Sequence, residues 1–219
     1  RIRSRLLCTT LMAGPSIWKA AAPKGEAASK PPAPPSAPAL AFALGGSSDI
    51  IGAHAMALAL GHNSVVLVQP GSAPSSQEQT GAVACAAVEP AASCVAPGGA
   101  YYDNSSMLAY LLAREPLLRA GYYLTQPKDE HGGFSAATLE ATTRALVDVG
   151  RAHGCTALVA LDFGGDVALP EPPSAAAGSV HQRDLLNLRA ATAAATELGI
   201  AGEHRCLVAA ALGVDAAAI

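Results

Sequence analysis

From Ala39 onward, short continuous apolar runs alternate with longer segments of helical character, and this alternation constrains the fold more than any other feature. The clearest runs are residues 39–44, 65–68 and 157–161. A strand without polar alternation must be covered on both faces, as in a parallel sheet with helices on each side. We therefore expect an α/β fold with a doubly wound, mostly parallel sheet in a Rossmann-like three-layer arrangement.

The segments between these runs contain signals for helix ends. One helix should follow the turn at residues 45–49 and end at Gly61, and another should begin at Ser135 and end at Gly150 or Gly154. Weaker patterns predict strands at 83–88, 122–124 and 206–212, helices at 104–115 and 183–198, and a polar loop at 71–79.

The first 38 residues differ in composition from the rest. Arg1, Arg3 and Arg5 precede an apolar stretch, no acidic residue occurs before Glu26, and the segment ends in a proline-rich run. This composition is typical of an organelle transit peptide. The mitochondrion is favoured over the plastid, and a secretory signal is the alternative.

The domain organisation follows from this contrast. We expect a disordered or extended targeting tail over residues 1–38 and a single α/β domain over residues 39–219. Because the chain starts at Arg1 and ends in an uncharged apolar run, we expect a fragment whose domain is truncated at its C-terminal end.

Charge and composition exclude some partners. The net charge of −3 and the pI near 6.1 provide no basic face for nucleic acid. The apolar stretch near the N-terminus is interrupted by Gly14 and Pro15 and is too short to span a membrane. The five cysteines are widely spaced and form no CxxC pair, so we expect neither a zinc site nor a disulfide framework.

A glycine-rich turn follows the first apolar run and is the first candidate ligand site. Its candidate ligand-binding residues are Gly45, Gly46, Ser47, Ser48 and Asp49. Such a turn exposes backbone N–H groups at the start of a helix, which suits a phosphate or a carboxylate. Asp49 could instead cap the helix itself, which would leave a tight turn without a ligand.

The same turn resembles that of dinucleotide-binding enzymes, but three features argue against NAD(P). The G-x-G-x-x-G spacing is absent, and the second strand ends in Gln69 and Pro70 without an acidic residue for a ribose. The Tyr-x-x-x-Lys pair of short-chain dehydrogenases is also missing, since Pro127 stands four residues after Tyr123.

A second turn places two carboxylates close together after the run at residues 157–161. Asp162 and Asp166 flank Gly164 and Gly165, whose bare backbone makes these glycines further candidate ligand-binding residues. Two carboxylates at this spacing can hold a divalent ion such as Mg²⁺, or act as a catalytic acid/base pair. Asp162 and Asp166 are therefore the candidate catalytic and metal-binding residues, the alternative being a loop cap and a solvated acid.

These motifs, taken in order, resemble the prokaryotic "domain of unknown function 1152" family. The resemblance spans roughly residues 39–219 and includes the two glycine turns, the helix that contains Asp184, and Gly213-Val214-Asp215, where the family has a Gly-x-x-Asp-Gly turn. It adds Asp184 to the candidate ligand-binding residues and supports the fold, but it implies no established activity. Ser47 and Ser48 replace two glycines of the family turn, which indicates a retuned or decaying site.

Two functional hypotheses follow. In the first, the protein binds a phosphorylated or carboxylated small molecule, with a divalent ion as one hypothesis for its cofactor, and the reaction is left open. In the second, it is a non-catalytic subunit of an organellar assembly that descends from such an enzyme. A shared crevice lined by Asp49, Asp162, Asp166 and Asp184 would favour the first hypothesis.

Overall fold

The computed structural model describes residues 37–45, 48–72, 82–92, 104–129, 132–163 and 182–210. Within these residues the chain forms a six-stranded sheet and four α-helices. The elements are β1 (Ala39–Ala43), α1 (Ser48–Ala59), β2 (Val65–Ser72), β3 (Ala84–Ala87), α2 (Asn104–Arg114), β4 (Leu118–Gln126), α3 (Ala136–His153), β5 (Ala157–Phe163), α4 (Arg183–Glu197), a 3-10 turn (Gly202–His204) and β6 (Arg205–Ala210).

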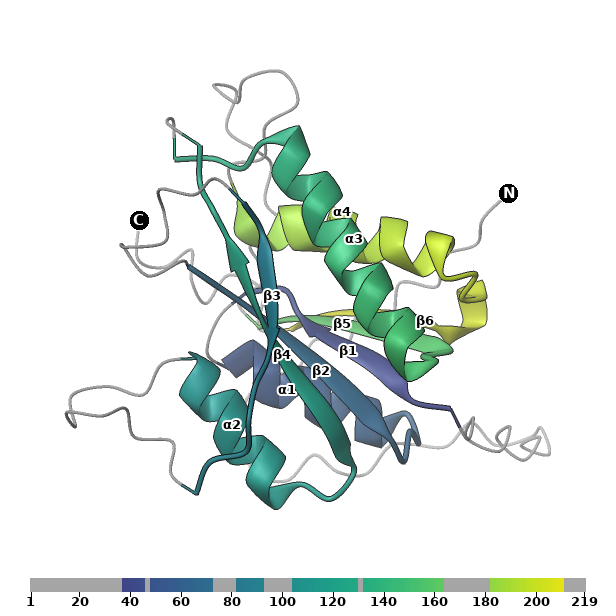
Figure 1. Ribbon diagram of the computed structural model, residues 1–219. Helices are drawn as coiled ribbons and strands as arrows, with labels where there is room; N and C mark the ends of the chain where they lie inside the picture. The colour runs from purple at the N-terminus through teal and green to yellow at the C-terminus, as the bar shows by residue number, and fades with distance from the viewer. Residues whose placement is uncertain are drawn as a thin grey trace.

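The sheet is doubly wound, as the sequence predicts. Its strand order is β3-β4-β2-β1-β5-β6, and every neighbouring pair is parallel except β3 and β4. β1 lies in the centre, and the chain goes from it first to β2 on one side and later to β5 on the other. Figure 1 shows the three layers, with α3 and α4 on one face of the sheet and α1 and α2 on the other.

The alternation of side chains along the central strand divides the core into two halves. Leu40 and Phe42 of β1 belong to the cluster beneath α3 and α4, whereas Ala41 and Ala43 belong to the cluster beneath α1 and α2. The small residues let α1 approach the sheet closely. At Gly52 of α1, an added Cβ would lie 2.1 Å from the ring of a β5 side chain, so no larger residue fits there without a shift.

The ends of α3 match the predicted signals. The Ser135 hydroxyl accepts a hydrogen bond from the Thr138 backbone N–H at 3.1 Å, which satisfies one free amide of the first turn. Gly154 ends the helix with φ +63°, a conformation that costs glycine little. These local signals predicted the start of the helix, and of the two predicted ends, Gly150 and Gly154, the structure shows Gly154.

The strands β2 and β4 are longer than predicted, and the predicted loop at residues 71–79 begins too early. Both strands pair with each other as far as Ser72 and Gln126, so residues 71–72 belong to β2. β2 pairs with β1 only as far as Val68. Beyond Val68, β2 has only β4 as a neighbour and its other side is an edge. Proline has no N–H to donate, so a strand tolerates Pro70 at such an edge.

None of the described helices is long and apolar enough to cross a membrane. The predicted tail lies outside the described residues except for its last two positions.

Candidate functional site

The candidate site lies where the direction of the winding reverses. In the sheet, β1 lies between β2 and β5. Along the chain, β1 is followed by α1 on one face of the sheet, and β5 is followed by α4 on the opposite face. The carboxyl ends of β1 and β5 therefore lie near the starts of two helices, α1 and α4. In open α/β sheets this topological switch point is where ligands bind.

Three aspartates converge at this point. Asp49 is the second residue of α1, Asp162 is the penultimate residue of β5, and Asp184 is the second residue of α4. One carboxylate oxygen of each lies within 4.8 Å of the other two. All three residues are buried, with exposed fractions of 2%, 0% and 9%. Each therefore comes from a different element, and the fold alone brings them together.

The Asp49 carboxylate ties the first turn to the neighbouring strand. Its Oδ2 accepts a hydrogen bond from the Gly45 N–H at 2.7 Å, and its Oδ1 accepts one from the Phe163 N–H at 2.9 Å. Both donors lie outside α1, because Gly45 belongs to the preceding turn and Phe163 is the last residue of β5. A carboxylate oxygen has two lone pairs, so accepting an amide does not by itself prevent such an oxygen from binding a cation.

Gly45 is required for the close approach of two of these carboxylates. A Cβ added to Gly45 would lie 2.7 Å from Asp49 Oδ2 and 2.8 Å and 3.0 Å from the two carboxylate oxygens of Asp184. Side chains essentially never approach a Cβ this closely. The glycine of the first turn therefore makes room for carboxylates, and its amide holds one of them.

The carbonyls of the same turn are held by buried amide side chains. Asn187 Nδ2 donates to the Leu44 carbonyl at 2.5 Å, and Gln69 Nε2 donates to the Gly45 carbonyl at 3.0 Å. Asn187 and Gln69 have no exposed surface. α4 and β2 thus hold the carbonyls of Leu44 and Gly45 through two buried side chains.

A further glutamine extends this polar network into α3. Gln126, the last residue of β4, donates through Nε2 to Asn187 Oδ1 at 2.6 Å and to Thr142 Oγ1 at 3.1 Å. Sequence analysis did not single out Asn187 or Gln126. The sequence signal for both residues was weak, because each is an isolated amide residue. Gln126 stands at the end of a strand and Asn187 on a buried helix face, both at the carboxyl edge of the sheet.

The structure covers the predicted site residues only in part. Asp49, Asp162 and Asp184 lie together, and Gly45 lies against two of them. Ser48 begins α1, but its side chain is outside the described part of the structure. The predicted site residues that lie wholly outside the described residues are Gly46, Ser47, Gly164, Gly165 and Asp166.

The described cysteines are not activated for nucleophilic chemistry. Burial raises the pKa of the Cys155 thiol to about 11. Burial, followed by the nearby Asp148 carboxylate, raises the pKa of the Cys85 thiol to about 11 as well. Burial also raises the pKa of Cys206. A nucleophilic cysteine has a lowered pKa, so these three are structural thiols.

His54 of α1 is buried, and its Nε2 has no hydrogen-bond partner among the described residues. Burial lowers the pKa of His54 below 6.5, against a smaller opposing effect of the Glu115 carboxylate. The unfolded chain therefore binds a proton at a higher pH than the folded chain does. Stability should be fully present above the unfolded pKa near 6.5 and should fall as the pH drops from there to the folded pKa.

We expect the free energy of unfolding in urea to decrease between pH 7.5 and pH 5, and to decrease less in a His54→Gln variant. His62 has a pKa lowered by burial and by His204, so part of the pH dependence should remain in that variant. An identical pH dependence in the variant and the wild type would contradict this assignment.

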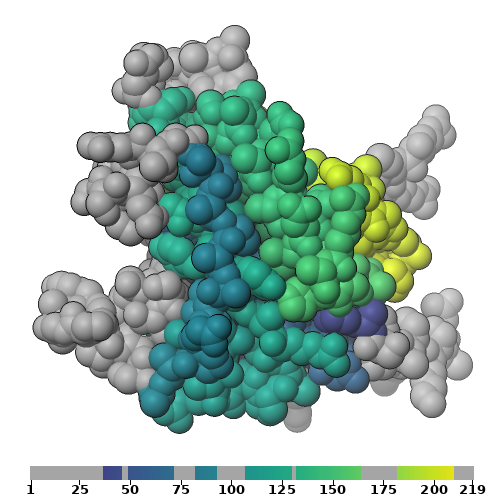
Figure 2. Space-filling model, viewed as in Figure 1, coloured from purple at the N-terminus to yellow at the C-terminus, as the bar shows by residue number. Residues whose placement is uncertain are grey.

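A surface groove of about 460 Å³ lies away from the aspartates, between α3 and the strands β3 and β4. Its lining is mostly alanine and valine, with Cys85, Tyr122, Arg144 and Asp148 as its polar groups. Figure 2 shows this side of the molecule, with β3 in blue beside α3 in green. We do not place the functional site here, because the groove contains none of the converging carboxylates.

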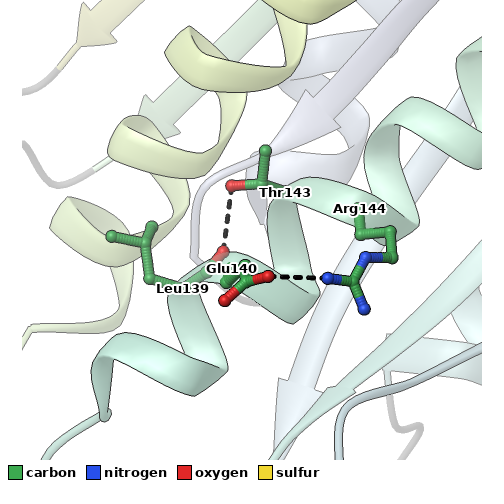
Figure 3. Close-up of polar contacts among 4 residues, drawn as sticks. All are labelled: Leu139, Glu140, Thr143 and Arg144. Atoms are coloured by element: carbon green, nitrogen blue, oxygen red, sulfur yellow. Dashed lines mark hydrogen bonds and ion pairs between the residues drawn. The ribbon is translucent and has the colours of Figure 1, made fainter.

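The polar contacts beside this groove are those of an ordinary helix surface. Arg144 pairs with Glu140 one turn earlier at 2.6 Å, and the Thr143 hydroxyl donates to the Leu139 carbonyl at 2.9 Å (Figure 3). Both side chains of the ion pair are more than half exposed. Exposed pairs of this kind contribute little to stability.

Comparisons of the chain with models of known protein families, with curated proteins and with solved structures found no match.

Proposed function

We propose that this protein binds a divalent cation through Asp49, Asp162 and Asp184, and that the cation helps to bind a phosphorylated or carboxylated small molecule. The observation that supports the proposal is the convergence of three buried carboxylates at the switch point of the sheet. The proposal shifts the predicted metal site from the Asp162–Asp166 pair to three residues from separate elements. Whether Asp166 adds a ligand stays a prediction.

The donor set suits a hard cation. Mg²⁺ and Ca²⁺ prefer carboxylate oxygens, which they bind at about 2.0–2.1 Å and about 2.3–2.6 Å respectively. Oxygens bound to one such ion therefore stand no more than about 4–5 Å apart. The three carboxylate oxygens already lie within 4.8 Å of one another, so small side-chain movements would complete the site.

A cation would also make the site compatible with an anionic ligand. Asp49 and Asp184 lie in the first turns of α1 and α4, and the N-terminal end of a helix favours negative charge. The aspartates oppose this effect, because they would repel a phosphate. A bound Mg²⁺ typically keeps open positions for substrate phosphates, so it would join the carboxylates to such a ligand. When bound, it could also act as a Lewis acid on that ligand.

Thermal unfolding in the presence of a ligand panel tests this proposal. The panel contains nucleotides, sugar phosphates and small carboxylic acids, each measured with Mg²⁺ and with EDTA. A true ligand at 100 times its Kd should raise the free energy of unfolding by roughly 2.7 kcal/mol. For a domain of this size that corresponds to a Tm increase of about 5–11 °C.

The Tm increase should require Mg²⁺ and should be absent in an Asp162→Asn variant. If a compound raises the Tm equally with Mg²⁺ and with EDTA, the ligand does not bind through a cation. If no compound of the panel changes the Tm, the small-molecule part of the proposal is wrong.

A further inference from the structure

The hydrogen bond from Asn187 to β1 joins the two sides of the candidate site. Asn187 lies one helical turn after Asp184 on α4, and both side chains are buried. Its Nδ2 donates to the Leu44 carbonyl at 2.5 Å. Leu44 directly precedes Gly45, whose N–H donates to Asp49. This bond therefore connects the helix that supplies Asp184 to the turn that holds Asp49.

Gln126 determines which way the Asn187 amide points. The Asn187 carbonyl oxygen accepts a hydrogen bond from Gln126 Nε2 at 2.6 Å, which holds the Asn187 amide with its amino group toward Leu44. The Asn187 amino group is then left to donate to Leu44. Thr142 of α3 accepts a second bond from the same Gln126 nitrogen. An apolar residue at position 126 would remove the donor that orients the Asn187 amide. An apolar residue at position 187 would remove the only donor to the Leu44 carbonyl that is seen in the described residues.

We infer that Asn187 is a positioning residue for the cation site, and that Gln126 orients it. The inference rests on the proposed function. The Asn187 bond fixes how far α4 stands from the end of β1, and that distance sets the separation of the Asp184 and Asp49 carboxylates. The Asp49 and Asp184 carboxylates lie tightly against Gly45, because an added Cβ there would lie 3.0 Å or less from both. A small change in their separation should therefore affect cation binding. Residues that orient metal ligands typically change metal affinity 10- to 100-fold when replaced.

A purely structural role must be separated from a positioning role. Removing a buried hydrogen-bonded amide lowers stability whether or not a metal binds nearby. The test therefore compares Mn²⁺ affinity, measured by EPR titration of the folded chain of 219 residues, among variants of similar stability. The variant is Asn187→Leu, and the control is Val147→Ala in α3, a buried residue that belongs to the apolar core cluster.

We expect Asn187→Leu to weaken Mn²⁺ binding about 10- to 100-fold and Val147→Ala to leave it unchanged. If Asn187 acts through Asp184, the effects of Asn187→Leu and of Asp184→Asn on Mn²⁺ affinity must not add. In an Asp184→Asn background, Asn187→Leu should then change the remaining Mn²⁺ affinity less than about threefold. Should Asn187→Leu fail to fold, Gln126→Leu provides the same comparison, because it removes the donor that orients Asn187 and leaves Asn187 itself in place.

The outcomes separate the two claims. A wild type that binds no Mn²⁺ overturns the proposed function, and this inference with it. A wild type that binds Mn²⁺, together with an Asn187→Leu variant of nearly equal affinity, overturns the positioning role alone. Fully additive effects of Asn187→Leu and Asp184→Asn would also overturn it, since they would show that Asn187 acts independently of Asp184.

Discussion

Replacing Asp162 with asparagine should lower the affinity for Mn²⁺ at least about 100-fold without unfolding the protein. Asp162 has no exposed surface and lies among the three converging carboxylates. Asparagine has the same shape but lacks the negative charge that a divalent cation requires. Because residues that only orient metal ligands already change affinity 10- to 100-fold, the loss of a direct ligand should cost more. EPR titration with Mn²⁺ measures the effect.

The matched control is Asp148→Asn, which removes the same charge from an exposed position on α3. It should bind Mn²⁺ as the wild type does, and both variants should retain the circular dichroism spectrum of the folded protein. If the two variants weaken Mn²⁺ binding equally, the effect comes from net charge and the assignment of Asp162 is wrong.

Gly45→Ala should separate the three carboxylates while the sheet stays intact. The new Cβ would lie 2.7 Å from Asp49 Oδ2 and 2.8 Å from Asp184 Oδ2. These atoms are at the ends of side chains, so they can move aside, but the movement breaks the bond between Asp49 and the Gly45 N–H. We expect Mn²⁺ affinity to fall at least tenfold and the free energy of unfolding to decrease by about 1–3 kcal/mol.

Gly202→Ala is the control for this change, since an added Cβ there meets nothing within 4 Å. Mn²⁺ titration and urea unfolding should give wild-type values for it. Wild-type Mn²⁺ affinity in Gly45→Ala would mean that the close approach of Asp49 and Asp184 does not matter for cation binding.

Much of the fold could be predicted because the signals are local. The apolar runs identify β1, β2 and β5, and Ser135 and Gly154 mark the ends of α3. The lengths of β2 and β4 could not be predicted in the same way, because they depend on pairing between strands that are far apart in sequence. Pro70 in particular reads as a strand breaker, and only the early end of β1 explains why β2 continues through it.

The site was harder to predict because it is assembled from separate elements. Asp49 and Asp162 stood out as acids beside glycine turns, and Asp184 entered through the family resemblance. The buried amides Asn187 and Gln126 did not stand out, since an isolated amide residue has no periodic signature. Their role depends on α4 and β4 meeting at the carboxyl edge, which no single segment encodes.

Several expectations from the sequence stay predictions. These are the family resemblance, the organelle targeting of the N-terminal segment and the alternative role as a subunit of an organellar assembly. The subunit hypothesis would gain support if Asp49, Asp162 and Asp184 could all be replaced by asparagine without any change in ligand or cation binding.

The most direct test of the account is the anomalous diffraction of Mn²⁺ in crystals of the protein grown or soaked with the ion. The account predicts a peak between Asp49, Asp162 and Asp184, with carboxylate oxygens at roughly 2.0–2.6 Å from it. A map without a peak at this position, from crystals held at Mn²⁺ concentrations that saturate any binding seen in solution, would contradict it.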